Sequence, residues 1–204
     1  MFNSIIRQGK ETIKMGKYEQ KTDKGYDLFE VSSAMIKCIR RGQEDEALYW
    51  AVELYNSGFV EYTWKRLRIL CSEDVGLAEP GLPAEIWALY EMHREQAKKK
   101  EDKNEPQRLF LTHAILRLSR ARKSRMIDWT LIWAWLTHKF RFFPIPDYAL
   151  DKHNERGRRL GRSWYHFFTE GTLLHPHYEV DREKEMRSRA QDAISNPAGN
   201  GLFD

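Results

Sequence analysis

Apolar residues recur every three or four positions along most of the chain from residue 26 onward. In the first such stretch Leu28, Val31 and Met35 fall on one face, which predicts an amphipathic helix. Two arginines followed by Gly42 are typical of a helix C-terminus, where cations and glycine are favoured. We therefore expect the first helix to end at Gly42.

Five further helices are predicted by the same spacing. Acidic residues and prolines mark some of their first turns, because negative charge and proline both suit a helix N-terminus. Period-two alternation is not seen, so we expect an all-α fold, a multi-helix bundle. The expected starts are Glu44, Glu61, Pro83, Pro106 and Ile127, and the sixth helix is expected to end at Phe143 before two prolines.

One helical domain is expected between two loosely ordered ends. Residues 1–25 are rich in lysine and polar residues without apolar periodicity, which predicts a flexible arm. Residues 26–180 carry the helical pattern, with a short helix and loops expected after Pro146. Residues 181–204 lose this pattern and are expected to form a frayed helix and a tail.

The composition is typical of a soluble cytoplasmic protein. The 13% aromatic residues are too many for a disordered chain, whereas the 31% charged residues and a mean hydropathy of −0.71 indicate a heavily solvated surface. No signal-peptide segment is seen, and the longest apolar stretch, Trp129–Trp135, is far shorter than the roughly 20 residues of a membrane span. Cys38 and Cys71 lack a metal-ligand spacing and are interpreted as buried hydrophobic residues.

Several blocks of the sequence form a recognisable pattern between about residues 26 and 165. They are Tyr26-Asp27-Leu28, Cys38-Ile39-Arg40-Arg41-Gly42, Glu46-Ala47-Leu48-Tyr49-Trp50, Arg66-Leu67, Ser72-Glu73-Asp74-Val75-Gly76-Leu77-Ala78 and, more weakly, Leu118 to Ser124. Together they resemble one known family, the C-terminal part of the RarA/MgsA replication-associated recombination ATPases. The resemblance implies an all-helical domain like the collar of clamp-loader AAA+ proteins, which mediates oligomerisation, typically to a tetramer.

The resemblance does not extend to an ATPase module. ATPases of this kind cradle phosphate with a GxxxxGK[ST] loop and hold magnesium with an acidic residue, and the sequence has no such loop. The acidic cluster Glu44–Glu46 cannot replace it, because no glycine loop accompanies it. We therefore expect a stand-alone collar-like domain that is not an enzyme and needs no cofactor.

Two basic runs are the candidate nucleic-acid-binding residues. The net charge of +4 and the pI near 9.0 are too mildly basic to decide this, so the distribution of charge matters more. Contacts to phosphate favour a binding surface, whereas helix ends and solvated faces also attract cations. The candidates are Arg120, Arg122, Lys123 and Arg125 in the first run and Lys152, Arg156, Arg158, Arg159 and Arg162 in the second.

Aromatic residues follow both basic runs. Residues 164–168 have a composition that could stack unpaired bases, although packing in the core is the favoured interpretation. Trp129, Trp133 and Trp135 are expected to fill the space between helices, with a subunit contact as the alternative for an exposed subset.

Other chemically suggestive residues have plainer interpretations. Glu73 and Asp74 resemble paired catalytic carboxylates, but bonds to backbone amides or to arginines of the same helix are favoured. His175 and His177 flank a proline without a third ligand nearby, which is weak support for a metal site.

Two functions stay open at this point. One is a non-catalytic, DNA-associated assembly module of DNA replication, recombination and repair, which forms a homo-oligomer and binds DNA through Arg/Lys surfaces. The other is a protein-interaction subunit that co-assembles with or regulates a RarA/MgsA-type ATPase without touching DNA. A hydrolase has the least support, because no nucleophile motif is recognisable.

Overall fold

The computed structural model describes residues 20–99 and 104–195. The expected arm therefore lies mostly outside the described residues, as do the last nine residues of the expected tail. Within the described residues the regular structure is helical, and the only isolated bridge pairs Lys21 with Asp27. This confirms the all-α class.

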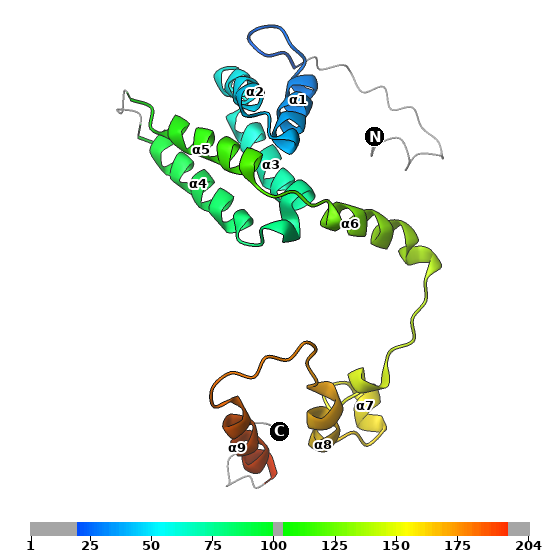
Figure 1. The fold of residues 1–204 in the computed structure, drawn as a ribbon. Helices are drawn as coiled ribbons and strands as arrows, with labels where there is room; N and C mark the ends of the chain where they lie inside the picture. The colour runs from blue at the N-terminus through cyan, green and yellow to red at the C-terminus, as the bar shows by residue number, and fades with distance from the viewer. Residues whose placement is uncertain (1–19, 100–103, 196–204) are drawn as a thin grey trace. The chain divides into compact units, whose positions relative to one another are not determined.

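The chain divides into two units, Met1–Lys139 and Phe140–Asp204, and each is described by itself. This division differs from the single domain of residues 26–180 expected from the sequence. The first unit contains a bundle of five helices followed by an aromatic sixth (Figure 1). Its helices are α1 (Leu28–Arg41), α2 (Glu44–Asn56), α3 (Val60–Leu70), α4 (Leu82–Ala97), α5 (Gln107–Arg120) and α6 (Met126–Thr137).

Local sequence signals fix the ends of α1. The Asp27 carboxylate accepts hydrogen bonds from the backbone N–H groups of Phe29 (2.8 Å) and Glu30 (3.1 Å), which caps the N-terminus. Gly42 has φ 71°, a left-handed conformation that glycine adopts without steric cost, and its N–H donates to carbonyls of the last turn. The predicted end of the first helix is confirmed.

The core lies between the first five helices. Trp64 of α3 is fully buried, together with Met35 and Ile39 of α1 and Ile115 of α5. Burying such large apolar side chains is the main stabilising term for a bundle of this size. Cys71 is also buried, which raises the pKa of its thiol to about 11.

Helix α3 continues into a π-helical turn, η1 (Cys71–Val75), and a 3-10 turn, η2 (Gly76–Ala78). Gly76 has φ 49°, and a β-carbon placed there would lie 2.8 Å from Cδ1 of Ile127. Glycine at this position therefore lets α6 approach the turn closely.

Helix α6 ends at Thr137, earlier than the expected Phe143. A 3-10 turn, η3 (His138–Phe140), follows it directly.

In its described residues, the second unit consists of several short helical turns followed by one longer helix. A 3-10 turn, η4 (Asp147–Ala149), precedes the one-turn helix α7 (Glu155–Arg159). Helix α8 (Trp164–His166) runs into a π-helical turn, η5 (Phe167–Gly171), and α9 (Glu183–Ser195) follows. The expected short helix with loops after Pro146 is present in this form.

Candidate nucleic-acid interface

The first basic run lies at the end of α5 and the start of α6. Arg120 donates two hydrogen bonds to the Glu44 carboxylate of α2, at 2.8 and 2.9 Å. Arg117, in the same turn, contacts Glu79 at 2.6 Å and Glu85 at 2.8 Å. These bidentate pairs join α5 to neighbouring elements and offset the charge of both arginines.

Lys123 closes the C-terminus of α5. Its ammonium group donates to the carbonyl oxygens of Leu118 (2.7 Å), Ser119 (3.0 Å) and Ala121 (2.7 Å). A lysine has three N–H donors, and all three are engaged here. Burial lowers the pKa of this ammonium group from its ordinary value. Lys123 therefore satisfies the free carbonyls of a helix end.

Arg125 belongs to an ion cluster built around a buried carboxylate. Asp74 is fully buried, and its Oδ1 lies 2.9 Å from Nε of Arg40 and 3.7 Å from Nη1 of Arg125. Glu73 contacts both arginines, at 3.3 and 3.2 Å, and Asp128 pairs with Arg125. The cluster thereby connects α1, η1 and the start of α6. The structural role expected for the two acidic residues is met by arginines of other elements, not of the same helix.

Arg122 differs from its neighbours, because its side chain is 81% exposed. Its Nε lies 3.9 Å from the Glu79 carboxylate, and its backbone N–H donates to Glu79 at 2.7 Å. Among the four candidates of the first run, Arg122 thus presents most of its charge to solvent.

The Glu79 carboxyl should make the free energy of unfolding decrease at acid pH. Hydrogen bonds from the Arg122 backbone N–H and the Arg117 side chain lower the pKa of its carboxyl below the ordinary 4.5. The stabilisation is therefore present above that value and is lost as the pH falls through the lowered pKa. We expect Glu79→Gln to be less stable than the parent at pH 7, and the difference to vanish under acid. Urea titrations of both proteins from pH 7 to pH 3 measure this, and a pH-independent difference would contradict it.

The second basic run lies on and around α7, where the backbone is tightly packed. Asn154 caps the helix, since its side chain accepts from the Gly157 N–H at 2.8 Å. A β-carbon on Gly157 would overlap the carbonyl oxygen of Asp151 and lie 2.6 Å from its nitrogen. Glycine is therefore required at this close approach to the Asp151 backbone.

Three of the five candidates in the second run have a charged or aromatic partner. Arg162 pairs with Asp147 at 2.7 Å, and Arg159 pairs with Glu155 one turn away. The ammonium of Lys152 lies 3.7 Å from the centroid of the Trp164 ring, a cation–π contact. These contacts help to fix the loop around α7.

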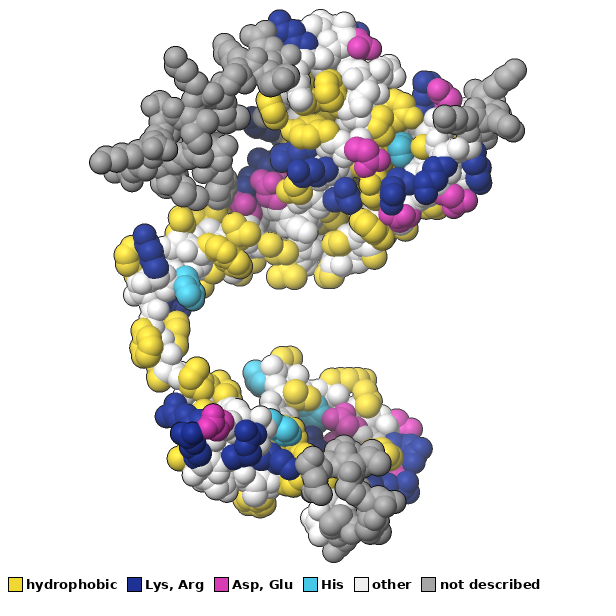
Figure 2. All heavy atoms as spheres, turned by 180° about the vertical axis from the view of Figure 1, so that it is seen from behind, with side chains coloured by type: hydrophobic (Ala, Val, Ile, Leu, Met, Phe, Trp, Pro, Cys, Tyr) yellow, Lys and Arg dark blue, Asp and Glu magenta, His cyan; other side chains and the backbone are white. Residues whose placement is uncertain are grey.

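Arg156 and Arg158 are the uncompensated members of the run. Both are exposed, and within the described part of the chain neither has a carboxylate oxygen within 4.0 Å. Arg158 donates only to the backbone carbonyl of Lys152, at 3.2 Å. Lys and Arg side chains gather on this side of the second unit (Figure 2).

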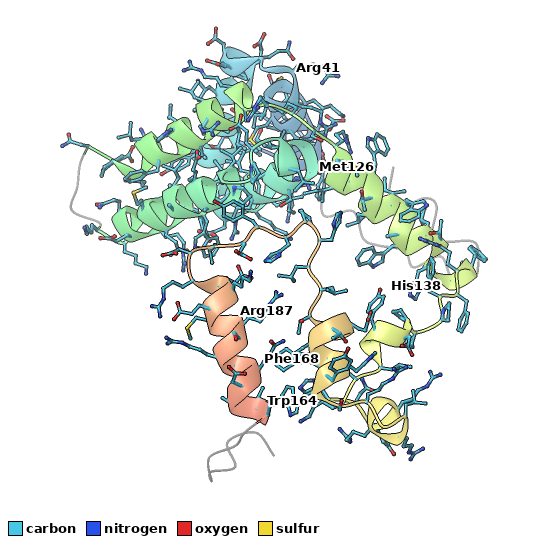
Figure 3. The ribbon with its side chains drawn as sticks, turned by 60° about the horizontal axis from the view of Figure 1, so that its bottom comes forward. Arg41, Met126, His138, Trp164, Phe168 and Arg187 are labelled. Atoms are coloured by element: carbon cyan, nitrogen blue, oxygen red, sulfur yellow. The ribbon has the colours of Figure 1, made fainter. Side chains whose placement is uncertain are left out.

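The aromatic group after this run packs mostly on itself. Trp164 and Phe168, both labelled in Figure 3, are stacked with ring centroids 5.8 Å apart. Phe167 meets both rings edge-on. These rings are half-buried and pack on one another, so the expected packing in the core is met only in part. Tyr165 is 79% exposed and stands outside the cluster.

Helix α6 exposes aromatic residues that were expected to be internal. Trp129, Trp133 and Trp135 are 61%, 54% and 77% exposed, so the expectation that they fill the space between helices is wrong. Figure 3 shows the helix between its labelled ends, Met126 and His138, with aromatic side chains projecting from it. The helix is apolar on all faces, so its periodicity does not show which face is buried. A subunit contact, the alternative interpretation, stays open.

The described residues contain no three-ligand metal site and no helix of membrane-spanning character. In residues 20–99 and 104–195, no group of three His, Cys, Asp or Glu side chains is placed to hold a metal ion. His177 instead contacts the Glu183 carboxylate at 2.9 Å. None of the described helices has both the length and the apolar character that a membrane crossing requires.

Comparison with known proteins identifies the origin of this architecture. Residues 42–170 match the family described as MgsA AAA+ ATPase C terminal, which is well over half of the chain. The chain is also 28% identical over 141 residues to replication-associated recombination protein A of Haemophilus influenzae, covering 69% of this chain and 29% of that protein. The match thus corresponds to the C-terminal helical part of such ATPases, and the 204 residues hold no phosphate-binding loop. The chain belongs to the MgsA AAA+ ATPase C-terminal family.

Proposed function

We propose that this chain is a non-catalytic, DNA-associated assembly module of replication and recombination, which oligomerises through its helical body and binds DNA through Arg/Lys surfaces in the cytoplasm. One observation carries the DNA part: Arg156 and Arg158 are exposed beside α7 without a carboxylate partner among the described residues. Uncompensated guanidinium groups attract phosphate, and phosphate contacts supply most sequence-independent affinity for DNA.

The two basic runs contribute unequally to this proposal. In the first run Arg120, Lys123 and Arg125 are engaged with carboxylates or carbonyls, so each would have to give up an existing partner. Arg122 is the exposed exception. We therefore assign the principal phosphate contacts to the second run and one further contact to Arg122.

Charge reversal tests the DNA proposal. We expect Arg156→Glu/Arg158→Glu to weaken binding of single-stranded and forked DNA by about 100-fold at low salt, because two phosphate contacts become repulsive. The matched control is Lys184→Glu/Arg187→Glu on α9, which makes the same charge change on exposed residues of the same unit. Fluorescence anisotropy with labelled oligonucleotides measures both. An equal loss in the two variants would indicate net charge alone and would overturn the assignment.

The exposed face of α6 supports assembly, and with it a second candidate function, co-assembly with a full-length ATPase of the family. Leu131 and Leu136 are 46% and 49% exposed beside the tryptophans, and hydrophobic atoms cover much of this segment in Figure 2. Apolar patches of this kind mark protein interfaces. The same surface would serve a homo-oligomer, for which the family resemblance implies a tetramer.

Light scattering after size-exclusion chromatography separates the two assembly modes. We expect the parent chain to elute as a homo-oligomer and Trp135→Ser/Leu131→Ser to elute as a monomer with unchanged helix content. A chain that is monomeric alone but enters a larger complex when mixed with a family ATPase would favour the second candidate. A parent that stays monomeric in both experiments would contradict both modes.

A further inference from the structure

A stacked arginine lies on the surface between α3 and α4, outside both basic runs. The guanidinium carbon of Arg68 is 4.2 Å from the ring centroid of Tyr90 and 5.5 Å from that of Trp87. The two rings are themselves in contact, with centroids 5.6 Å apart and planes at 57°. Helices α3 and α4, which supply these residues, pack against each other in the bundle (Figure 1).

Arg68 has no carboxylate partner. Its Nε donates to the carbonyl oxygen of Trp64 at 3.3 Å, and no carboxylate oxygen of the described residues lies within 4.0 Å of it. Arg94, whose guanidinium carbon lies 5.5 Å from the Tyr90 ring centroid, is by contrast paired with Glu91 at 3.2 Å. The aromatic rings therefore hold the Arg68 guanidinium in place while its terminal N–H groups keep their capacity to bind an anion.

Trp87 is the exposed ring of this group. Its side chain is 51% exposed, whereas Tyr90 is 6% exposed and donates its hydroxyl hydrogen to Glu61 at 2.7 Å. Tyr90 thus forms a fixed support beneath Arg68. The Trp87 indole is left as a flat surface that a ligand can reach, directly beside a positioned positive charge.

A second cation lies on the same face of α3. Lys65 is exposed and is three residues from Arg68, a spacing that places two side chains together on a helix. Within the described residues Lys65 also has no carboxylate oxygen within 4.0 Å. The face therefore combines two uncompensated charges with one exposed indole.

We propose that Arg68 and Trp87 form a binding site for single-stranded DNA, in which Trp87 stacks on a base and Arg68 binds the adjacent phosphate. This rests on the proposed DNA association and adds a specific contact and a preference for unpaired strands, since a base inside a duplex cannot offer its face. An acidic peptide would satisfy Arg68 and Lys65 but would leave the indole without a role. Stacking beside a cationic groove is the usual mode of sequence-tolerant single-strand binding.

The test measures affinity for a labelled oligothymidylate over a series of salt concentrations. Trp87→Ala should lower affinity by about tenfold without changing the salt dependence, because stacking involves no counterion release. Arg68→Gln should reduce the slope of log K against log salt by about 0.7, the value for one phosphate contact on a single strand. Trp87→Phe should retain most of the affinity. Tyr178→Ala, which removes another exposed aromatic ring, and Lys37→Gln on α1 are the matched controls.

A second readout does not depend on any variant. Photocrosslinking of the unmodified chain to an oligonucleotide that contains 5-bromodeoxyuridine should yield a peptide joined at Trp87, identified by mass spectrometry. A crosslink confined to other residues would count against the site even if a variant had lost affinity through misfolding.

The outcomes separate this site from the broader proposal. Suppose that the parent binds single strands, that Arg156→Glu/Arg158→Glu abolishes this affinity, and that Trp87→Ala and Arg68→Gln leave it unchanged. In that case the proposed site is wrong and the DNA association stands. If the parent binds no oligonucleotide at low salt, both fail. If only Arg68 matters and an acidic peptide competes, the face binds protein and the inference is overturned.

Discussion

Asp74→Ala is expected to lower the free energy of unfolding of the first unit by about 3 kcal/mol, because it leaves two arginines facing a site built for a buried carboxylate. Asp74 is fully buried and lies 2.9 Å from Arg40 and 3.7 Å from Arg125. Half-buried Glu73 contacts both arginines but can only partly replace the lost charge.

The measurement is urea unfolding followed by circular dichroism. Asp74→Asn keeps the shape of the side chain but removes its charge, so we expect an intermediate loss. Glu95→Ala is the control, since Glu95 is exposed and its pairing with Lys99 at 3.3 Å is a surface ion pair, for which we expect less than about 1 kcal/mol. Equal stabilities of Asp74→Ala and Glu95→Ala would show that the ion cluster does not stabilise the bundle.

Gly157→Ala is expected to disrupt the second unit around α7. The added methyl group would overlap the carbonyl oxygen of Asp151, which is rigid backbone and cannot move aside cheaply. We expect amide hydrogens of residues 155–162 to exchange at nearly unprotected rates, and affinity for DNA to fall with them, because Arg156 and Arg158 lose their fixed positions.

Gly161→Ala is the matched control for this substitution. Gly161 has φ 71° but open space around the position of a β-carbon, so alanine there incurs only left-handed backbone strain of about 1–2 kcal/mol. Its amide protection should fall by much less than that of Gly157→Ala. If the amide hydrogens of residues 155–162 exchange at the same rate in both variants, the loss of protection comes from backbone strain and not from the close contact with Asp151.

Local signals in the sequence predicted most helix boundaries of the first unit. A glycine after two arginines predicted the end of α1, and prolines marked the starts of α4 and α5. These features act within one or two turns, so they can be recognised without knowing the tertiary structure. The end of α6 was placed too late, because the first helix-breaking residue after it in the sequence is Pro144.

The candidate site was harder to predict, because pairing depends on distant residues. Arg120 and its partner Glu44 are 76 positions apart, and Arg125 meets Glu73 across 52 positions. A basic run therefore indicates where positive charge lies in the sequence but not how much of it is already offset. Arg68 could not be predicted from the sequence either, since a single arginine in an amphipathic helix has no distinguishing pattern.

The exposed aromatic face of α6 has a similar explanation. Trp129 and Trp135 were expected inside the bundle because large apolar side chains are usually buried. Burial within one chain and burial in an assembly produce the same composition, and only the structure distinguishes them. The exposure of these tryptophans is the observation that supports the proposed assembly through α6.

The DNA-associated role is tested by the affinity of the unmodified chain for a single-stranded oligonucleotide, measured by anisotropy from 50 to 300 mM salt. We expect log K to fall linearly with log salt, with a slope set by at least three phosphate contacts, from Arg156, Arg158 and Arg68. Absence of binding at the lowest salt, or binding that does not change with salt, would contradict a DNA-associated role.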